Sequence, residues 1–285
     1  MSLKLSRRLF ILQMLLTIAA CQSNKKSIPE LELVIGTVTY GEEQETLNKL
    51  SRLRDYLGQK TGSLIQIEPV FNENIAIECI KRGSWSLVFA TPGLAAIAIS
   101  DYKYVPILPL GIEINSRSVL IVRKDSSLQK IKDLQGQVVA LGLPGSAAGY
   151  YVPLYNLYGL TLAEIVLAPT PRTVVEMVAE KKVAAGAVSL EQFNVHRSTL
   201  NNTEFRILFT DPQILPPGSV LIRADIDSKR RESIINSMKD APLSLIQDLN
   251  YVPNGEIPNY KYMISVVKRV IPITQNINSK PAQLF

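Results

Sequence analysis

Short apolar runs alternate along the chain with longer segments whose apolar residues recur every three or four positions. Runs of the first kind predict β-strands, and segments of the second kind predict α-helices. The predicted strands are residues 31–38, 64–70, 86–90, 104–110, 118–123, 138–141, 165–167, 184–189, 205–209 and 220–222. The predicted helices are residues 42–58, 72–81, 91–99, 150–158, 172–180, 227–249 and 259–270. This alternation indicates an α/β fold with a largely parallel sheet, followed by a frayed tail from residue 276.

The first twenty residues have a different pattern, which is typical of an export signal. Three basic residues precede an apolar stretch, residues 9–20, that is too short to span a membrane. Residues 18–21 (IAAC) resemble a bacterial lipobox. Cys21 is therefore predicted to become the lipid-carrying first residue of the mature protein. The alternative is an ordinary cleaved signal followed by an incidental cysteine.

The export route and the segment after the signal are inferred from the same region. Residues 6–11 (SRRLFI) resemble a twin-arginine signal, but paired arginines also occur in ordinary Sec signals, so both routes stay open. Residues 21–30 are polar and contain a proline, and we expect a lipidated N-terminus with a flexible tether. Acyl chains on Cys21 would hold the folded body at a membrane, in the periplasm or at the cell surface.

The basic charge of the chain is partly a property of the signal. The formal net charge is +6, but residues 1–20 hold three of the 31 basic residues and none of the 25 acidic ones. The rest of the chain has no Lys/Arg-rich run with interleaved aromatic residues, so no nucleic-acid partner is expected. The length of 285 residues suggests about two domains.

The residue types needed for several chemistries are scarce. Two cysteines and one histidine exclude a disulfide framework and a Cys/His metal cluster, and they leave little basis for Cys–His or Ser–His catalysis. The aspartates are scattered, and no nucleophile–base pair can be argued. We therefore expect neither an enzyme nor a cofactor or metal ion.

Three loops that lead from a predicted strand into a predicted helix stand out as candidate site segments. They are residues 38–41, 91–93 and 144–149. Ligands of α/β sheets bind where strands end and helices begin, because helix N-termini present unpaired N–H groups and a partial positive charge. Each loop alone is explained by plain helix capping. Together they predict an anion site.

Six segments follow one another in an order and spacing that are typical of a known family. They are residues 33–36 with Tyr40, residues 86–92 (SLVFATP), 133–140 (DLQGQVVA), 146–150 (SAAGY), 204–208 (EFRIL) and 216–218 (PPG). Through them the sequence resembles the substrate-binding proteins of phosphate, phosphite and phosphonate ABC transporters. The resemblance covers about residues 31–250 and depends on order and spacing rather than on one decisive motif.

This resemblance implies a two-lobed type 2 periplasmic-binding-protein fold with a ligand cleft between the lobes. Lobe 1 would be residues 31–115 plus 218–285, and lobe 2 would be residues 116–217. Lobe closure would capture an oxyanion and deliver it to an ABC permease without chemistry. The implied ligand-binding residues are Tyr40, Thr91, Pro92, Ser146, Ala147, Ala148, Gly149 and Ser189.

Departures from the family pattern leave other ligands open. Ala147 and Ala148 stand where the family has hydroxyl side chains, and Ser189 stands where it often has an acid. Arg172 lies near the position of a family histidine. The alternatives are the same fold binding a neutral or aromatic metabolite, and a ligand sensor that reports to a membrane receptor.

Overall fold

The computed structural model describes residues 32–41, 43–111, 116–200 and 203–285. The predicted signal, Cys21 and the tether therefore lie outside the described residues. Within those ranges, no helix has the length and apolar character required to cross a membrane.

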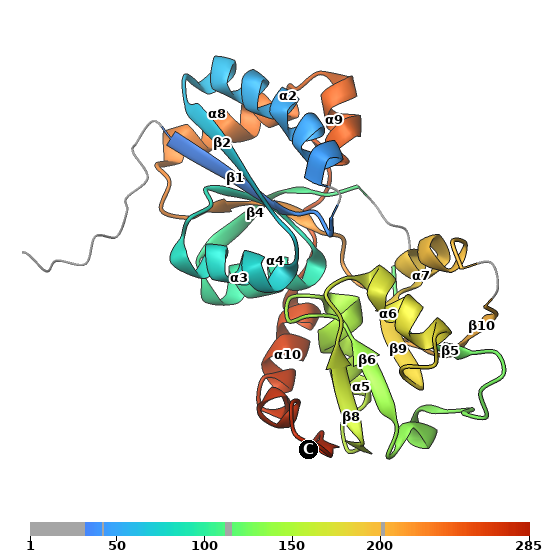
Figure 1. The fold of residues 1–285 in the computed structure, drawn as a ribbon. Helices are drawn as coiled ribbons and strands as arrows, with labels where there is room; N and C mark the ends of the chain where they lie inside the picture. Colours follow the sequence, from blue (N-terminus) through green and yellow to red (C-terminus); the bar gives the residue numbers. More distant parts are fainter. Residues whose placement is uncertain (1–31, 42, 112–115, 201–202) are drawn as a thin grey trace, which may run out of the picture. The chain divides into compact units, whose positions relative to one another are not determined.

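The first sheet contains five strands in the order β2-β1-β3-β11-β4. Its strands are β1 (Glu32–Val38), β2 (Leu64–Val70), β3 (Leu87–Ala90), β4 (Tyr104–Pro109) and β11 (Ser219–Arg223). Strands β2, β1 and β3 are parallel, and β11 is antiparallel to both of its neighbours. The helices beside this sheet are α2 (Glu43–Thr61), α3 (Glu73–Arg82), α4 (Pro92–Asp101), α8 (Ser228–Lys239) and α9 (Leu243–Leu249). Figure 1 labels β1, β2 and β4 of this sheet, with α2, α8 and α9 beside it. Helix α2 packs on α8 and α9, and α3 packs on α4.

The second sheet also contains five strands, in the order β10-β5-β9-β6-β8. They are β5 (Ser118–Arg123), β6 (Val138–Leu141), β8 (Glu164–Leu167), β9 (Ala185–Ser189) and β10 (Phe205–Thr210). Strands β8, β6 and β9 are parallel, whereas β5 is antiparallel to β9 and β10. The helical segments are η2 (Ile131–Leu134), η3 (Ala147–Tyr151), α5 (Val152–Asn156), α6 (Pro171–Ala179) and α7 (Leu190–Arg197).

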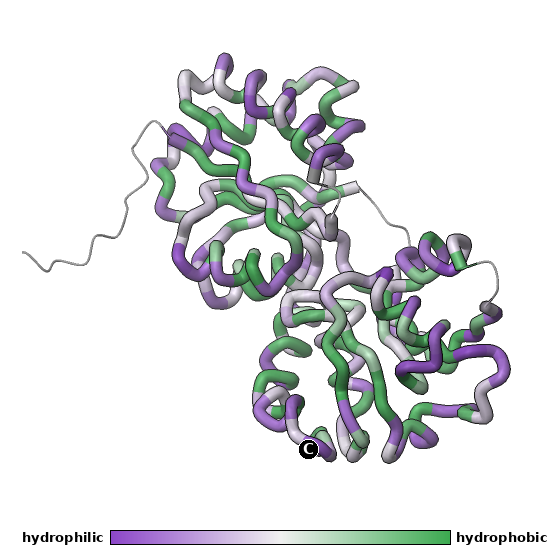
Figure 2. The backbone as a smooth tube through the Cα atoms, viewed as in Figure 1, coloured by the Kyte–Doolittle hydropathy of each residue, from purple (hydrophilic) through white to green (hydrophobic). Residues whose placement is uncertain are grey.

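Alternating strands and helices confirm the predicted α/β class, and in each sheet one strand, β11 or β5, runs opposite to the other four. Each sheet has its own apolar core. Leu33, Ile35 and Leu87 lie in the first core, and Val119, Val174 and Val188 lie in the second. Figure 2 shows the apolar segments concentrated in the strands of both sheets.

Two predicted helices are interrupted. Pro242 cannot donate an N–H to a helix, so the predicted helix 227–249 is divided into α8 and α9. The predicted helix 150–158 begins earlier, as the π-helical turn η3, and continues as α5 only to Asn156. Such π-helical turns occur often at functional sites.

The C-terminal segment also differs from its prediction. After α10 (Lys261–Val270) and η4 (Ile273–Asn276), strand β12 (Ala282–Gln283) pairs with β7 (Thr161–Leu162). The tail is therefore not frayed, and Ala282 and Leu284 are fully buried. This pairing joins the end of the chain to a segment expected in lobe 2, although residues 218–285 were assigned to lobe 1. The remaining lobe boundaries stay a prediction.

Candidate functional site

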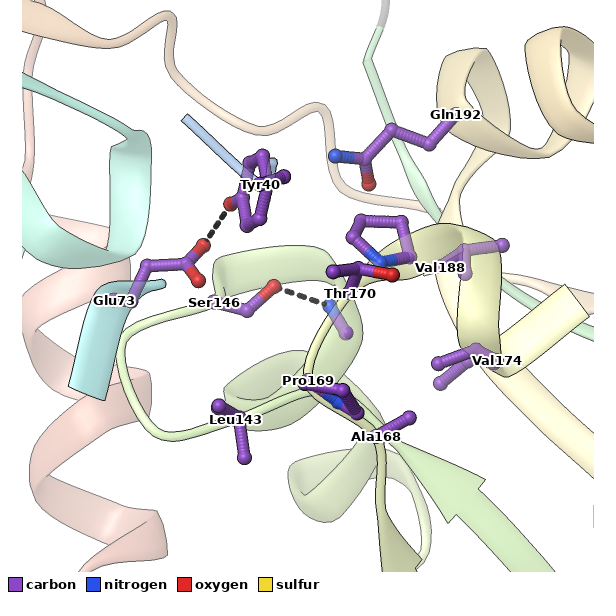
Figure 3. A pocket seen from close by; sticks show the side chains of 14 residues that line it. Tyr40, Glu73, Leu143, Ser146, Ala168, Pro169, Thr170, Val174, Val188 and Gln192 are labelled. Atoms are coloured by element: carbon purple, nitrogen blue, oxygen red, sulfur yellow. Dashed lines mark hydrogen bonds between the residues drawn. The ribbon is translucent and has the colours of Figure 1, made fainter. Parts of the chain in front are cut away.

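The carboxyl ends of β1 and β2 place Tyr40 beside the start of α3. The parallel pairing of these strands continues past their last residues, because Thr39 N donates to Val70 O at 2.9 Å and Tyr40 N donates to Phe71 O at 3.0 Å. Tyr40 then takes φ 51, a left-handed conformation that is uncommon for a bulky residue. This turn sends the Tyr40 side chain toward Glu73, the first residue of α3 (Figure 3).

Glu73 is a buried carboxyl group, and its side chain is 3% exposed. The Tyr40 hydroxyl donates a hydrogen bond to Glu73 Oε1. Burial raises the pKa of Glu73, and the hydrogen bond from Tyr40 only partly offsets this effect. The pKa of Tyr40 is also raised, first by burial of its hydroxyl and then by the negative charge of Glu73. This pair therefore holds the phenol protonated and disfavours the charged carboxylate.

The loop after β6 supplies the second part of the site. Gly142 N donates to Gly149 O at 2.8 Å and closes the loop. Ser146 accepts a hydrogen bond from Gly149 N at 3.1 Å, so it caps the turn η3. The buried Ser118 hydroxyl donates to Ala148 O at 2.7 Å and fixes the loop to the second sheet. Ser146 is held in place by these contacts.

The strands beside β6 complete the arrangement. Ala168 N donates to Leu141 O at 2.8 Å, which extends the β6–β8 pairing and leads the chain to Thr170. Thr170 caps α6 by accepting a hydrogen bond from Thr173 N. At the end of β9, Ser189 caps α7 and donates to Gln192 Oε1 at 3.1 Å. The side-chain nitrogen of Gln192 then points toward Tyr40 (Figure 3).

These segments line a partly open cavity of about 10 Å³ at the carboxyl ends of β1 and β2 in the first sheet and of β6, β8 and β9 in the second. It is lined by Tyr40, Glu73, Gly142, Leu143, Ser146, Gly149, Ala168, Pro169, Thr170, Pro171, Val174, Ala187, Val188 and Gln192. This volume is close to the minimum that holds one water molecule.

The structure brings three of the predicted ligand-binding residues together. Tyr40, Ser146 and Gly149 all line this cavity. Ala147 and Ala148 are buried within the loop and do not line the cavity, and Ser189 does not line it either but bonds to Gln192, which does. The contacts that these residues make with a ligand remain a prediction.

Thr91 and Pro92 line a different and larger cavity. Its volume is about 320 Å³, and its other described lining residues include Val38, Phe89, Leu110, Gly218 and Leu249. Thr91 begins α4 without a side-chain capping bond, and its buried Oγ1 has no hydrogen-bond partner among the described residues. The predicted loop 91–93 therefore does not reach the cavity that holds Ser146.

The same loop nevertheless contacts the loop at 144–149. A side chain at Gly93 would overlap the Gly145 carbonyl, and a side chain at Gly145 would overlap Glu73 Cβ. Gly145 also has φ 108, a conformation that suits glycine. Because neither residue has a side chain, Gly93 of expected lobe 1 and Gly145 of expected lobe 2 lie in close contact.

Glu73, Thr170 and Gln192 were not among the predicted site residues. A signal for Glu73 was present, because residues 71–73 follow a predicted strand that neighbours the strand ending at Tyr40. Arg172 does not take part, since its exposed side chain bonds to Glu176 Oε1 at 2.8 Å. Trp85 is buried against Gly36 and packs rather than presenting a stacking surface.

The charge of the small cavity is unusual for an anion site. Among the described residues that line it, none is Lys, Arg or His, and Glu73 is the only acid. Polar contacts come from the Tyr40 and Ser146 hydroxyls, Thr170 and the Gln192 amide. Positive potential comes from the N-terminal end of α6 at Thr170 and Pro171. The cavity therefore combines hydrogen-bonding groups with one buried acid and has no basic side chain among the described residues that line it.

Solved structures similar to this one identify its fold. XAC2383 from Xanthomonas citri, bound to chloride ion, is 18% identical over 85% of this chain and 99% of its own, with a TM-score of 0.71. PhnD1 from Prochlorococcus marinus, in complex with methylphosphonate, is 14% identical over 86% and 100%, with a TM-score of 0.68. A binding protein component of an ABC phosphonate transporter from Pseudomonas aeruginosa is 14% identical over 86% and 87%, with a TM-score of 0.64. The fold is that of the two-lobed periplasmic binding proteins.

The family is identified by sequence. The profile of the family described as "ABC transporter, phosphonate, periplasmic substrate-binding protein" matches residues 35–244. The chain therefore belongs to the periplasmic substrate-binding proteins of phosphonate ABC transporters, a family of transport proteins rather than enzymes. No curated protein matches the sequence.

Proposed function

We propose that this protein captures a phosphate- or phosphonate-like oxyanion between its two lobes and delivers it to an ABC permease. The observation that carries the proposal is the cavity where Ser146 and Gly149 of one sheet face Tyr40 of the other. Family membership supports an ABC importer as the destination. PhnD1 has the same fold and holds methylphosphonate, which supports the ligand class.

Lobe closure is part of this proposal. A tetrahedral oxyanion is several times larger than a water molecule, whereas the cavity, with about 10 Å³ of space for the centre of a water-sized sphere, has room for about one water. The ligand therefore enters when the segments around Tyr40 and Ser146 separate, and it is enclosed when they return. The contact of Gly93 with Gly145 supports such a closed arrangement.

The test is a binding screen of residues 22–285 by thermal shift, confirmed by calorimetry. The panel contains phosphate, phosphite, methylphosphonate, aminoethylphosphonate, sulfate and neutral metabolites. A ligand at about 100 times its Kd stabilises the fold by about 2.7 kcal/mol. We expect a shift with at least one phosphorus oxyanion.

Ser146→Leu and its matched control locate the binding. Ser146→Leu fills the cavity and should abolish the shift, whereas Ser233→Leu, on the exposed side of α8, should preserve it. The absence of a shift with every phosphorus oxyanion would reject the proposal.

A neutral metabolite is the second candidate ligand. The observation that favours it is the apolar lining by Leu143, Pro169, Val174 and Val188, together with the lack of a basic side chain among the described lining residues. The same screen separates the two candidates. A neutral ligand would shift the melting temperature equally at low and high salt, while oxyanion binding is weakened by salt.

Membrane anchoring through Cys21 is also proposed. Its support is the IAAC sequence at residues 18–21. Labelling with a fatty-acid analogue in the producing cells should mark the wild-type protein and leave Cys21→Ser unmarked. Incorporation of label into Cys21→Ser would contradict the anchor, and Cys79→Ser serves as the control because Cys79 is buried.

A further inference from the structure

The charge of the small cavity conflicts with a fully ionised ligand. Glu73 is 3% exposed and lines the cavity directly. A doubly charged oxyanion placed there would lie within a few ångströms of the carboxylate, in surroundings that screen charge poorly. Like charges at that distance cannot both persist, and such a pair retains one proton.

Among the described residues, no cationic side chain lines the cavity beside Glu73, and the position of Glu73 at the N-terminus of α3 gives only a partial positive charge. The Glu73 carboxylate accepts a hydrogen bond from the Tyr40 hydroxyl, in the turn after β1, and is further stabilised by the backbone N–H of Glu73 itself. The next titratable group is Tyr151 of η3, whose pKa is raised by burial and to a smaller degree by the charges of Tyr150, Asp101 and Glu73. None of these groups is cationic at neutral pH. The described lining contains no Lys, Arg or His that could neutralise a third negative charge.

We propose that this site binds its phosphorus oxyanion together with one proton, which is shared between Glu73 and a ligand oxygen. This inference rests on the proposed function and specifies the ionic form of the ligand. Above the pKa of Glu73 and of the ligand, the dianion, the Glu73 carboxylate and one proton from solvent combine to form the complex. The same proton returns to solvent when the ligand leaves.

The state of Glu73 in the free protein favours this arrangement. Burial already raises its pKa, so the carboxyl accepts a proton more readily than an exposed glutamate does. A protonated Glu73 donates a hydrogen bond to an oxyanion, and the Gln192 amide and the Ser146 hydroxyl lie in the same cavity. In this arrangement a proton neutralises one negative charge, as a basic side chain would in another site.

The experiment is calorimetric titration of the wild-type protein, residues 22–285, with methylphosphonate. Titrations at about pH 6 and about pH 9, in buffers of different ionisation enthalpy, give the number of protons taken up on binding. We expect close to one proton per ligand at about pH 9. The Kd should then rise about tenfold for each pH unit in this alkaline range.

Glu73→Gln is the decisive variant, because glutamine keeps the shape of the side chain and removes its titration. Proton uptake at about pH 9 should fall close to zero, and the Kd should stop rising with pH. Glu191→Gln removes an exposed carboxylate next to Gln192 and should retain the wild-type uptake. Wild-type binding without proton uptake, or full uptake by Glu73→Gln, would overturn the inference.

Tyr40→Phe provides an independent test if Glu73→Gln does not fold. Removing the phenol takes away a hydrogen bond that favours the Glu73 carboxylate, so the uptake curve should move to higher pH. A curve that does not move would overturn the role of Glu73.

A competing explanation is that Glu73 binds an ammonium group of the ligand. In that case Glu73→Gln would lose affinity for aminoethylphosphonate selectively, and the wild-type protein would take up no proton with methylphosphonate. Failure of the proposed function gives a different result, which is the absence of binding by every phosphorus oxyanion at either pH.

Discussion

Two strand–helix junctions of the first sheet differ in what they reach. Residues 38–41 follow β1 and place Tyr40 in the small cavity with Ser146. Residues 91–93 follow β3, the strand next to β1, but Thr91 and Pro92 face the larger cavity. Both junctions lie at the carboxyl end of a parallel strand, and both carry polar groups. The difference shows that a junction belongs to the site only if its side chains face the Ser146 loop of the second sheet, and a position at a strand end is not enough.

Residues 91–93 affect the small cavity through their backbone rather than through their side chains. Gly93 touches the backbone of the loop at Gly145, so it sets how closely the segments around the cavity can approach. Thr91, by contrast, leaves its Oγ1 buried and without a partner among the described residues. We infer that residues 91–93 contribute shape through Gly93 and little polar chemistry through Thr91.

Gly93→Val should produce the largest effect on binding. The added side chain overlaps the Gly145 carbonyl and keeps the two loops apart. We expect the Kd for the oxyanion to rise at least about 100-fold, equivalent to about 2.7 kcal/mol, as measured by calorimetry. Gly58→Ala, in α2 and away from the cavity, is the control. An unchanged Kd for Gly93→Val would mean that these loops do not meet in the complex.

Ser146→Ala should weaken binding by about tenfold, because one hydrogen bond to a charged ligand is lost. Ser189→Ala is the matched comparison, since the Ser189 hydroxyl is already bonded to Gln192. Both variants lose a helix cap and should unfold about 1 kcal/mol more easily. Equal losses of affinity in calorimetry would show that the two serines have the same role, contrary to this interpretation.

Glu73→Gln should stabilise the free protein at neutral pH. Because burial raises the pKa of Glu73 in the folded state, the free energy of unfolding decreases as pH rises through that pKa. Glutamine does not ionise, so the free energy of unfolding of the variant does not decrease in this way. Urea denaturation near pH 8 should therefore give a free energy of unfolding about 1 kcal/mol higher for the variant than for the wild type. The gain should disappear at about pH 3, below the ordinary glutamate pKa of about 4.3, because the carboxyl is then protonated in both the folded and the unfolded state. A gain that is the same at both pH values would point to packing rather than charge.

Thr91→Val should have the smallest effect. The Thr91 hydroxyl makes no capping bond, so its removal should change the free energy of unfolding by at most about 1 kcal/mol, in the stabilising direction. The oxyanion Kd should stay within about twofold. Thr170→Val removes a hydroxyl that caps α6 and should destabilise by about 1 kcal/mol. A large loss of affinity in Thr91→Val would place Thr91 in the ligand site after all.

The element pattern was largely predictable because it depends on local sequence. Apolar runs identified every strand of the two five-stranded sheets, and helical spacing identified α2, α3 and α10. The errors have local causes as well. Pro242 interrupts a periodic apolar segment, and the polar tail gave no sign that Ala282 and Leu284 would be buried.

The site was predictable only in part. Tyr40, Ser146 and Gly149 were found because strand ends followed by glycine or a small polar residue have a recognisable local pattern. Glu73 escaped because a glutamate at a helix start is ordinary on the surface, and its burial depends on Tyr40 and on the loop at Gly145.

The sequence by itself determined the α/β class, the family and the residues able to cap helices, since these follow from periodicity and neighbouring residues. Only the tertiary structure decided which strand ends share a cavity. The tertiary structure also decided that the buried carboxyl of Glu73 lines this cavity and that the Arg172 side chain does not. The physical reason is that burial and charge pairing depend on contacts between residues far apart in the chain, such as Tyr40 with Glu73 and Gly93 with Gly145.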